Sequence, residues 1–142
     1  MTDAPFEIHR CGPEDAGLVQ RAGALFDHAP LTAETERFLT SSGHHLLLAL
    51  VGSEPVGFVS GIEVVHPDKV VEMLLYELAV AEDAQGRGIG TALATALAHL
   101  ARDRGCRGMW VLTDEDNTAA RMAYTRAGAT IEERTLLLEW RF

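Results

Sequence analysis

The chain has 142 residues, the length of one ordinary domain, and its 47% hydrophobic and 23% charged residues are typical of a globular protein. Twelve basic against twenty-one acidic residues give a formal charge of −9, which argues against nucleic acid and anionic membranes as partners. The first ten residues lack the pattern of a secretory signal, and no apolar run reaches the roughly 18 residues that span a bilayer. We therefore expect a single cytoplasmic domain over residues 1–142.

The first half of the chain predicts one strand, two helices and an antiparallel meander. Alternation over residues 6–10 predicts a half-buried strand, and the Gly-Pro-Glu-Asp sequence that follows is a suitable start for a helix over about 13–27. A second, shorter helix is predicted over 32–39. Three strand-like runs separated by turns then predict the meander, over residues 45–51, 56–65 and 70–80.

The second half predicts a βαβ unit and two further elements. An apolar stripe at helical spacing predicts a helix over about 88–104, and a short strand over 107–113 follows it. A crossover helix between two strands implies that those strands are parallel. Residues 114–117 offer N-cap candidates for a helix that runs through Arg126. A strand over 129–141, broken near Glu133, completes the chain. Together these elements predict an α/β fold with a mixed sheet of six to seven strands and helices on both faces.

A glycine-rich loop lies between the third meander strand and the long helix. It consists of Gln85, Gly86, Arg87, Gly88, Ile89, Gly90 and Thr91. Glycine lets backbone amides approach a ligand closely, and the positive end of a helix dipole favours a phosphate group. The loop therefore indicates an anion-binding site, although a glycine-rich turn that merely caps the helix explains the same residues.

Two common nucleotide-binding motifs do not fit this loop. A P-loop ends in Gly-Lys-Ser/Thr, whereas this loop ends in Gly90-Thr91 without a lysine. The dinucleotide fingerprint Gly-x-Gly-x-x-Gly also fails, because its sixth position is Thr91 counted from Gly86 and Leu93 counted from Gly88. Asp114 ends the next predicted strand, where an acid that binds a ribose would lie, so a dinucleotide site remains a weaker alternative.

Two motifs resemble those of the GNAT superfamily of acetyl-CoA-dependent N-acetyltransferases. The family signature Gln/Arg-x-x-Gly-x-Gly/Ala, which likewise follows a strand, is matched by Gln85, Gly88 and Gly90. The second motif, Asn-x-x-Ala-x-x-x-Tyr-x-x-x-Gly-Phe, is matched by Asn117, Ala120, Tyr124, Gly128 and, in place of the usual Phe, Ala129. The detailed match covers residues 70–129. Within the family, the run over 75–80 and the compact second half are most similar to aminoglycoside 3-N-acetyltransferases.

The resemblance implies a GNAT-like fold and acetyl-CoA as cosubstrate. It places the coenzyme on the glycine loop, residues 85–91, and its pantetheine arm against Ala79, Val80 and Asn117. Asn117 is also a suitable N-cap for the following helix, and the residues alone do not separate these two roles. The resemblance further implies a bulged strand before the loop, in which the amide of Val80 stabilises the developing oxyanion.

Two side chains are candidates for the proton transfers in amine acetylation. Tyr124 is, by the resemblance, the general acid that protonates the leaving thiolate, since a phenol is a donor at neutral pH. Its alternative role is packing on an amphipathic helix. Glu77 interrupts an apolar run typical of a strand covered on both faces, and burial there would raise its pKa toward that of a useful base. Glu77 is therefore the candidate base, unless it faces solvent or pairs with an arginine.

The cysteines and histidines indicate no other chemistry. Cys11 and Cys106 form no paired motif, and the six histidines have no metal-ligand spacing, so we predict neither a disulfide nor a metal site. Cys106 lies at the far end of the long helix, about 24 Å from the glycine loop at the helical rise, too far to carry the acetyl group. Transfer is therefore expected to be direct, within a ternary complex.

We predict an N-acetyltransferase that acetylates a primary amine of a small, cationic acceptor. The alternative is a non-catalytic acyl-CoA-binding or sensing module. Several acids lie in segments expected to rim the acceptor cleft, where they would attract a cation: Glu34, Glu36, Asp68, Glu72 and Glu77. The predicted partners are acetyl-CoA and this amine, with no nucleic acid and no membrane. The sequence is compatible with a homodimer but silent on oligomeric state.

Overall fold

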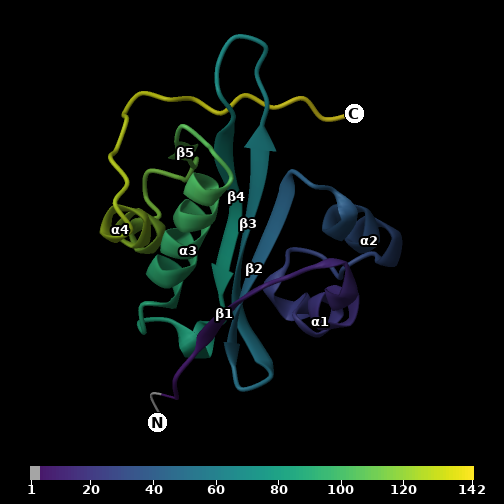
Figure 1. The fold of residues 1–142 in the computed structure, drawn as a ribbon. Coiled ribbons are helices and arrows are strands. Elements are labelled where there is room, and N and C mark those ends of the chain that lie inside the picture. The colour runs from purple at the N-terminus through teal and green to yellow at the C-terminus, as the bar shows by residue number, and fades with distance from the viewer. Residues whose placement is uncertain (1–3) are drawn as a thin grey trace.

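The computed structural model describes residues 4–142 and forms a mixed sheet flanked by helices (Figure 1). The strands lie in the order β1-β2-β3-β4-β5. Their bounds are β1 Glu7–Arg10, β2 His44–Val51, β3 Glu54–Val64, β4 Glu72–Val80 and β5 Met109–Trp110. The helices are α1 Ala16–Arg21, α2 Thr32–Thr40, α3 Ile89–Asp103 and α4 Thr118–Arg126. Within residues 4–142, no helix combines the length and apolar character needed to cross a membrane.

The pairing of the strands confirms the predicted meander and the predicted βαβ unit. Strands β1 to β4 pair antiparallel with their neighbours, and β5 pairs with β4 in parallel after the crossover through α3. Because the meander is antiparallel, the C-terminal end of β4 lies at the same end of the sheet as the start of β1. The glycine loop therefore lies near the N-terminal segment of the chain.

Two hydrophobic clusters cover the two faces of the sheet. Figure 1 shows α3 and α4 on one side of the sheet and α1 and α2 on the other. The first cluster packs one apolar side of α3, including Leu93 and Leu97, against Val59 and other sheet residues. The second packs Val19 of α1 against the opposite face, where Phe58 lies. Strand β2 is buried on both faces, as its nearly continuous apolar run requires. The predicted helices on both faces of the sheet are confirmed.

Strand β4 contains an irregularity in its pairing with β3. Ser60 is the partner of Glu77, but the next residue of β3, Gly61, is the partner of Leu75. Tyr76 is therefore the extra residue of a β-bulge, and its side chain is 62% exposed. The bulge lies in the strand before the glycine loop, as expected, four positions ahead of Val80.

The predicted helix over residues 13–27 is divided into three short pieces. A 3₁₀ turn at Pro13–Asp15 leads into α1, which ends at Arg21, and a second 3₁₀ turn covers Gly23–Leu25. Glycine disfavours a continuous helix, and Gly17 and Gly23 both lie in this stretch. The second predicted helix, over 32–39, corresponds to α2 and is confirmed.

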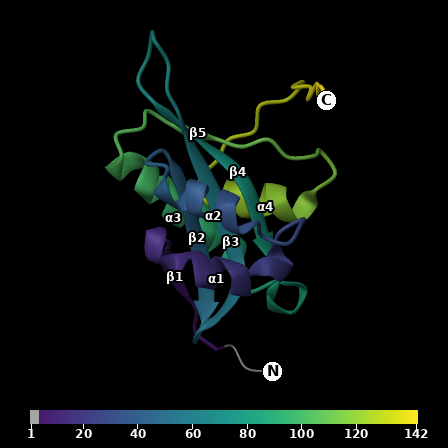
Figure 2. The ribbon, with the colours of Figure 1, turned by 90° about the vertical axis from the view of Figure 1, so that its right-hand side faces the viewer.

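The predicted strand over residues 129–141 is wrong, and the predicted strand over 107–113 is shortened to β5. The described sheet therefore has five strands rather than six to seven. Every residue from 129 to 142 is exposed, and Figure 2 shows this segment, in yellow, leaving α4 and ending away from the sheet. The segment pairs with no strand among the described residues, so its backbone groups make none of the inter-strand hydrogen bonds that define a strand.

Candidate active site

The glycine loop adopts a backbone conformation that its glycines make accessible. Gly86 and Gly88 have φ angles of 77° and 79°, in the left-handed region that L side chains rarely occupy. Gly88 is the N-cap of α3 and has no side chain with which to cap the first turn. The amides of the first turn of this 15-residue helix are therefore left for another acceptor, at the positive end of the helix dipole.

The two polar side chains at the start of the loop are already engaged within the chain. The Gln85 side-chain amide donates to the carbonyl oxygen of Val80 at 3.1 Å, which ties the loop to the end of β4. The Arg87 guanidinium donates to the carbonyl oxygen of Ala4 in the N-terminal segment. In this structure these side chains shape the loop, and ligand binding would rest on its backbone amides.

Gly90 brings the start of α3 close to both β4 and α4. A Cβ atom placed on Gly90 would lie 3.6 Å from the Cβ of Ala123, 3.7 Å from Cδ2 of Leu78 and 3.8 Å from Cγ2 of Val80. A methyl group would fit at these distances, whereas the branches of a valine would have to displace a neighbour. The glycine loop, the end of β4 and the helix that carries Tyr124 are therefore parts of one region.

Helix α4 begins at a capped residue and carries Tyr124 on its inner side. Asn117 caps the helix, because its Oδ1 accepts a hydrogen bond from the amide of Ala120 at 3.1 Å. The N-cap role considered for Asn117 in the sequence analysis is thus present in the structure. Tyr124 is partly buried against the cluster formed with α3, and this burial raises the pKa of its phenol above the ordinary value of 10.0. The hydroxyl is therefore protonated at neutral pH and can donate.

Glu77 lies in a partly buried position on β4 beside a second carboxylate. Its backbone amide donates to the hydroxyl oxygen of Ser60 at 3.2 Å. Burial, together with the nearby charge of Asp27, raises the pKa of Glu77 above its ordinary value of 4.5. The structure contains no arginine salt bridge to Glu77 among its described residues. The predicted direction of the Glu77 pKa shift is confirmed. Asp27 lies close enough to affect this pKa, although no sequence motif indicated Asp27 as a site residue.

Glu77 and Tyr124 approach this region from opposite faces of the sheet. Ala79 packs in the cluster under α1, while Leu78 and Val80 pack in the cluster under α3. Alternation along the strand therefore turns Glu77 to the same face as Ala79, away from the face that α3 and α4 cover. A substrate that meets both side chains has to pass the edge of β4 between them.

That edge is open beside the site. Within residues 4–142, β4 pairs with β5 only through Met73 and Leu74. From Leu75 to Val80 the outer edge of β4 has no strand beside it, so backbone groups on that side are available to a ligand. Strand β5 is short, and the chain then turns away toward α4, which leaves this edge uncovered.

Two of the acids predicted to rim the acceptor cleft lie elsewhere. Glu72, at the other end of β4, contacts His66 Nε2 at 2.9 Å and lies 4.0 Å from Nε of Arg107. Asp68 lies in the turn before β4, at that same end of the sheet. Five positions of a strand separate Glu72 from Glu77, roughly 17 Å. The nearby charge that raises the pKa of Glu77 is therefore that of Asp27, in the segment that follows α1, and not that of an acid in the β3–β4 turn.

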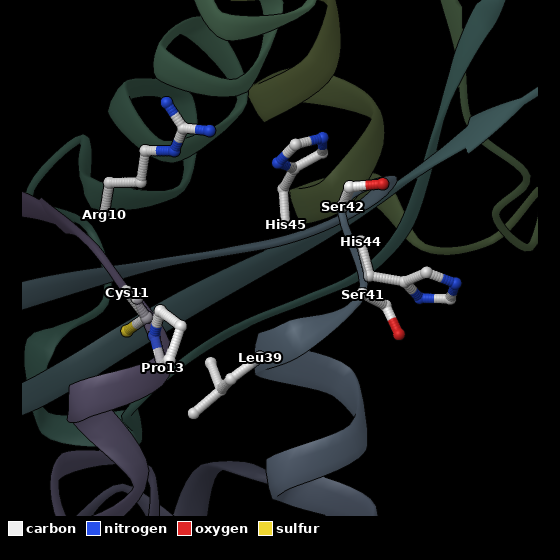
Figure 3. A pocket seen from close by; sticks show the side chains of 9 residues that line it. Arg10, Cys11, Pro13, Leu39, Ser41, Ser42, His44 and His45 are labelled. Atoms are coloured by element: carbon white, nitrogen blue, oxygen red, sulfur yellow. The ribbon is translucent and has the colours of Figure 1, made fainter.

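A hollow of about 290 Å³ at the opposite end of the sheet contains none of the predicted site residues (Figure 3). Near it, atoms of His9, Cys11 and Asp15 that could bind a metal lie within 4.8 Å of one another. Asp15 already accepts a hydrogen bond from the Gly12 amide at 2.8 Å, and His9 Nε2 lies 3.1 Å from the same oxygen. These contacts explain Asp15 as a cap of the first turn.

Comparison with known sequences places the chain among acetyltransferases. A sequence model of the Acetyltransferase (GNAT) family matches residues 10–129. The mycothiol acetyltransferase of Nocardia farcinica is 33% identical over 140 residues, which cover 90% of this chain and 39% of that protein. The L-2,4-diaminobutyric acid acetyltransferase of Streptomyces coelicolor is 36% identical over 87 residues, covering 58% of this chain and 50% of the relative. The chain thus aligns with half or less of these relatives.

Solved structures of acetyltransferases share the fold. An aminoglycoside acetyltransferase from an uncultured soil metagenomic sample, in complex with trehalose, has a TM-score of 0.90 at 21% identity, covering 99% of this chain and 98% of that one. The aminoglycoside N-acetyltransferase AAC(6′)-Iy, in complex with CoA, has a TM-score of 0.80 at 19% identity, with coverage of 99% and 98%. The resemblance seen in the two motifs is confirmed: with a family match over residues 10–129, the chain belongs to the GNAT acetyltransferase family.

Proposed function

We propose that the protein transfers the acetyl group of acetyl-CoA directly to a primary amine of a small, cationic acceptor. The observation that carries this proposal is the uncapped first turn of α3, shaped by two left-handed glycines beside the open edge of β4. A backbone so arranged can bind a pyrophosphate and, along the strand edge, an extended amide-containing arm. Both groups occur in acetyl-CoA, which supplies the activated acetyl group when it is bound.

The binding residues are those of the loop and of the strand that precedes it. The amides from Gly86 to Thr91 would hold the phosphates, because they point from a positive helix end that lacks a side-chain cap. The backbone of Ala79 and Val80 would bind the pantetheine arm, and Asn117 would border it from the start of α4. Arg87 contributes through its backbone amide, since its guanidinium contacts Ala4.

The proton transfers fall to the two side chains on either side of the β4 edge. Glu77, with its raised pKa, accepts a proton from the attacking amine, directly or through a water molecule. As nitrogen bonds to the carbonyl carbon, the amide of Val80 stabilises the negative charge on the oxygen. When the carbon–sulfur bond breaks, the Tyr124 hydroxyl donates its proton to the sulfur. Tyr124 then regains a proton from solvent, and Glu77 releases its proton to solvent.

Direct transfer is supported by the state and position of both cysteines. Burial and the Asp15 and Glu14 carboxylates raise the pKa of the Cys11 thiol to about 12. Burial and Glu63 raise the pKa of Cys106, which follows the C-terminal end of α3, whereas the glycine loop precedes its start. Neither thiol is a good nucleophile at neutral pH, since the thiolate is the reactive form.

A cationic amine is proposed as the acceptor because Glu77, on one side of the site, lies in the field of a second carboxylate. Asp27 and Glu77 interact closely enough to affect the Glu77 pKa, and a cation between them would relieve their repulsion. The relatives' names are consistent with amine acceptors, since aminoglycosides and 2,4-diaminobutyric acid both carry amines.

The test measures release of free CoA from acetyl-CoA against a panel of aminoglycosides, polyamines, amino acids and peptides. Direct transfer predicts intersecting initial-velocity lines, whereas an acetylated enzyme would produce the parallel lines of a ping-pong mechanism. Tight CoA binding without turnover of any amine would instead support an acyl-CoA-binding or sensing module. Thermal stabilisation by NAD but not by CoA would favour the dinucleotide alternative.

A further inference from the structure

Three side chains that can bind a metal lie together where β1 leads into the first turn of the chain. His9 lies in β1, Cys11 follows that strand, and Asp15 ends the 3₁₀ turn Pro13–Asp15. One ligand atom of each residue, an imidazole nitrogen, a thiol sulfur and a carboxylate oxygen, lies within 4.8 Å of the other two. The cluster follows the end of β1, whereas the glycine loop lies near the start of that strand. It is therefore separate from the candidate active site.

Alternation along β1 turns His9 and Cys11 to the same face of the sheet. Ile8 packs in the cluster under α3, whereas Cys11 packs in the cluster under α1. The Cys11 amide donates to the carbonyl oxygen of Leu46 at 2.9 Å, so the extended backbone continues past the end of the strand. Side chains two positions apart in extended backbone point the same way. Figure 3 shows the intervening Arg10 side chain on the opposite side from Cys11, so its positive charge points away from the cluster.

The turn after Cys11 folds Asp15 back toward the strand. Asp15 Oδ2 accepts a hydrogen bond from the Gly12 amide at 2.8 Å and lies 3.1 Å from His9 Nε2. Both contacts use the same carboxylate oxygen, so Oδ1 can bind a metal while the turn stays capped. The side chains of Asp15 and His9 are 16% and 38% exposed. The cluster is therefore partly shielded, yet an ion can enter it from solvent.

The distances between the ligand atoms fit a tetrahedral metal ion. Zn²⁺ binds nitrogen and oxygen at about 2.0–2.2 Å and thiolate sulfur at about 2.3 Å, so its ligand atoms lie roughly 3.3–3.7 Å apart. The 3.1 Å between His9 and Asp15 is close to this spacing, and the sulfur of Cys11 has to approach by at most about 1 Å. Mixed nitrogen, sulfur and oxygen ligands are typical of Zn²⁺, whereas Ca²⁺ and Mg²⁺ prefer oxygen alone. The ligand set therefore favours zinc.

The charges around the cluster also favour a cation. The charges that act most on the Cys11 thiol are those of two carboxylates, Asp15 and Glu14. A Cβ atom placed on Gly12 would lie 2.7 Å from Oε2 of Glu14, so that carboxylate folds back over the backbone beside the cluster. A metal ion would relieve the repulsion between these groups. Glu14 or a water molecule is then available for the fourth position of a tetrahedral site.

We propose that His9, Cys11 and Asp15 bind one Zn²⁺ ion, which fastens β1 to the turn that precedes α1. On binding, the Cys11 thiol gives its proton to the solvent, because the thiolate is the form that binds a metal. The proposal departs from the sequence prediction of no metal site. No histidine or cysteine spacing in the sequence indicates this site, because strand alternation and a turn bring its ligands together. This inference does not depend on the proposed acetyl transfer.

The first experiment titrates Zn²⁺ into the full chain, reduced and freed of metal, in competition with a chromophoric chelator. We expect one ion per chain. His9→Gln, Cys11→Ser and Asp15→Asn should each weaken the affinity at least about 100-fold, because each removes one of three protein ligands. Asp15→Asn keeps an oxygen that can accept from the Gly12 amide, so the turn remains capped.

Two matched controls use the same residue types at other places in the fold. Cys106 is the second free cysteine and follows α3, and His99 is exposed on α3. Cys106→Ser and His99→Gln should therefore bind Zn²⁺ as tightly as the native chain does. Circular dichroism of every variant verifies that it is folded, so loss of the ion is not confused with unfolding.

The second experiment replaces Zn²⁺ with Co²⁺, whose absorption spectrum reports the ligands. A cobalt–thiolate band should appear in the near ultraviolet for the native chain and for Cys106→Ser, but not for Cys11→Ser. The proposal is overturned by a native chain that binds no Zn²⁺, by an affinity that the three ligand substitutions leave unchanged, or by a cobalt–thiolate band that survives Cys11→Ser.

Discussion

The side-chain amide of Gln85 donates a hydrogen bond to the carbonyl oxygen of Val80, and this contact ties the glycine loop to the strand that carries the candidate base. It closes the four-residue segment, 81–84, between the end of β4 and the loop. The loop can then present its amides at the same end of the sheet as the open edge of β4. In this structure the Gln85 side chain therefore helps to position the loop.

The conformation of Gly88 leads to the first prediction. Gly88→Val should weaken CoA binding at least about 10-fold, because valine strains a left-handed backbone and crowds the proposed phosphate site. Gly105→Val is the matched control, since Gly105 has a φ of 81° in open space at the other end of α3. Both variants should lose similar thermal stability. Calorimetric titration with CoA that finds equal affinities in the two folded variants would reject the loop as the coenzyme site.

The second prediction concerns Tyr124. Tyr124→Phe should lower kcat roughly 10- to 1000-fold, with little change in the KM for acetyl-CoA, because it removes the proton donor and keeps the aromatic packing. Tyr76→Phe is the control, since Tyr76 is the other tyrosine of the chain and is 62% exposed at the bulge. Steady-state kinetics with a good acceptor are the measurement. A Tyr124→Phe enzyme as fast as the native one would leave Tyr124 with a packing role alone.

The third prediction follows from the raised pKa of Glu77. Activity should rise with pH as Glu77 loses its proton, and this ascending limb should lie above the ordinary carboxyl value of 4.5. Asp27→Asn removes a nearby negative charge, so it should lower the Glu77 pKa and move the limb to lower pH. Glu77→Gln should abolish the limb and most of the rate. The pH profiles of kcat/KM provide the test, and identical profiles in all three proteins would make Glu77 structural.

The same pKa shift has a consequence for stability. A carboxyl whose pKa is raised in the folded state favours folding when protonated, and that contribution is lost as the pH rises through the folded-state value. At neutral pH the charged Glu77 therefore costs stability. Glu77→Gln should melt at the same temperature as the native protein or higher, even while it loses activity. Thermal denaturation at neutral pH measures this, and a clearly lower melting temperature would indicate a structural role.

The final prediction concerns the charge of the acceptor. If a polycation is drawn to Asp27 and Glu77, its kcat/KM should fall as ionic strength rises, because the Debye length shrinks from about 10 Å at 0.1 M to about 3 Å at 1 M. Acetyl-CoA is an anion bound by local amides, so its KM should not follow the salt dependence of the cationic acceptor. Rates measured across a salt series distinguish the cases. A neutral acceptor that outperforms every polycation without salt dependence would remove the cationic acceptor but not the acetyltransferase.

Local features of the sequence were sufficient to predict the helix and strands that surround the glycine loop. The 3.6-residue spacing of Ile89, Leu93 and Leu97 predicts α3, and the three apolar runs with their turns predict β2, β3 and β4. The glycines and the two motifs then indicate the coenzyme site and the family. These properties depend on neighbouring residues, so they can be read without knowledge of distant contacts. The broken helix before α2 shows the limit, because short helices depend on what packs against them.

Contacts between distant parts of the chain decided the rest. The bulge at Tyr76 exists because β4 pairs with β3 in a particular register. The charge of Asp27 affects the pKa of Glu77 because the segment after α1 packs on the face where Glu77 points. The engagement of Arg87 with Ala4 joins residues 83 positions apart. Residues 129–141 have the sequence of a strand, but strand formation requires a partner edge that local sequence does not provide. The sequence by itself determined the family and the helix that presents the loop, whereas tertiary structure decided which charges meet and which edges remain open.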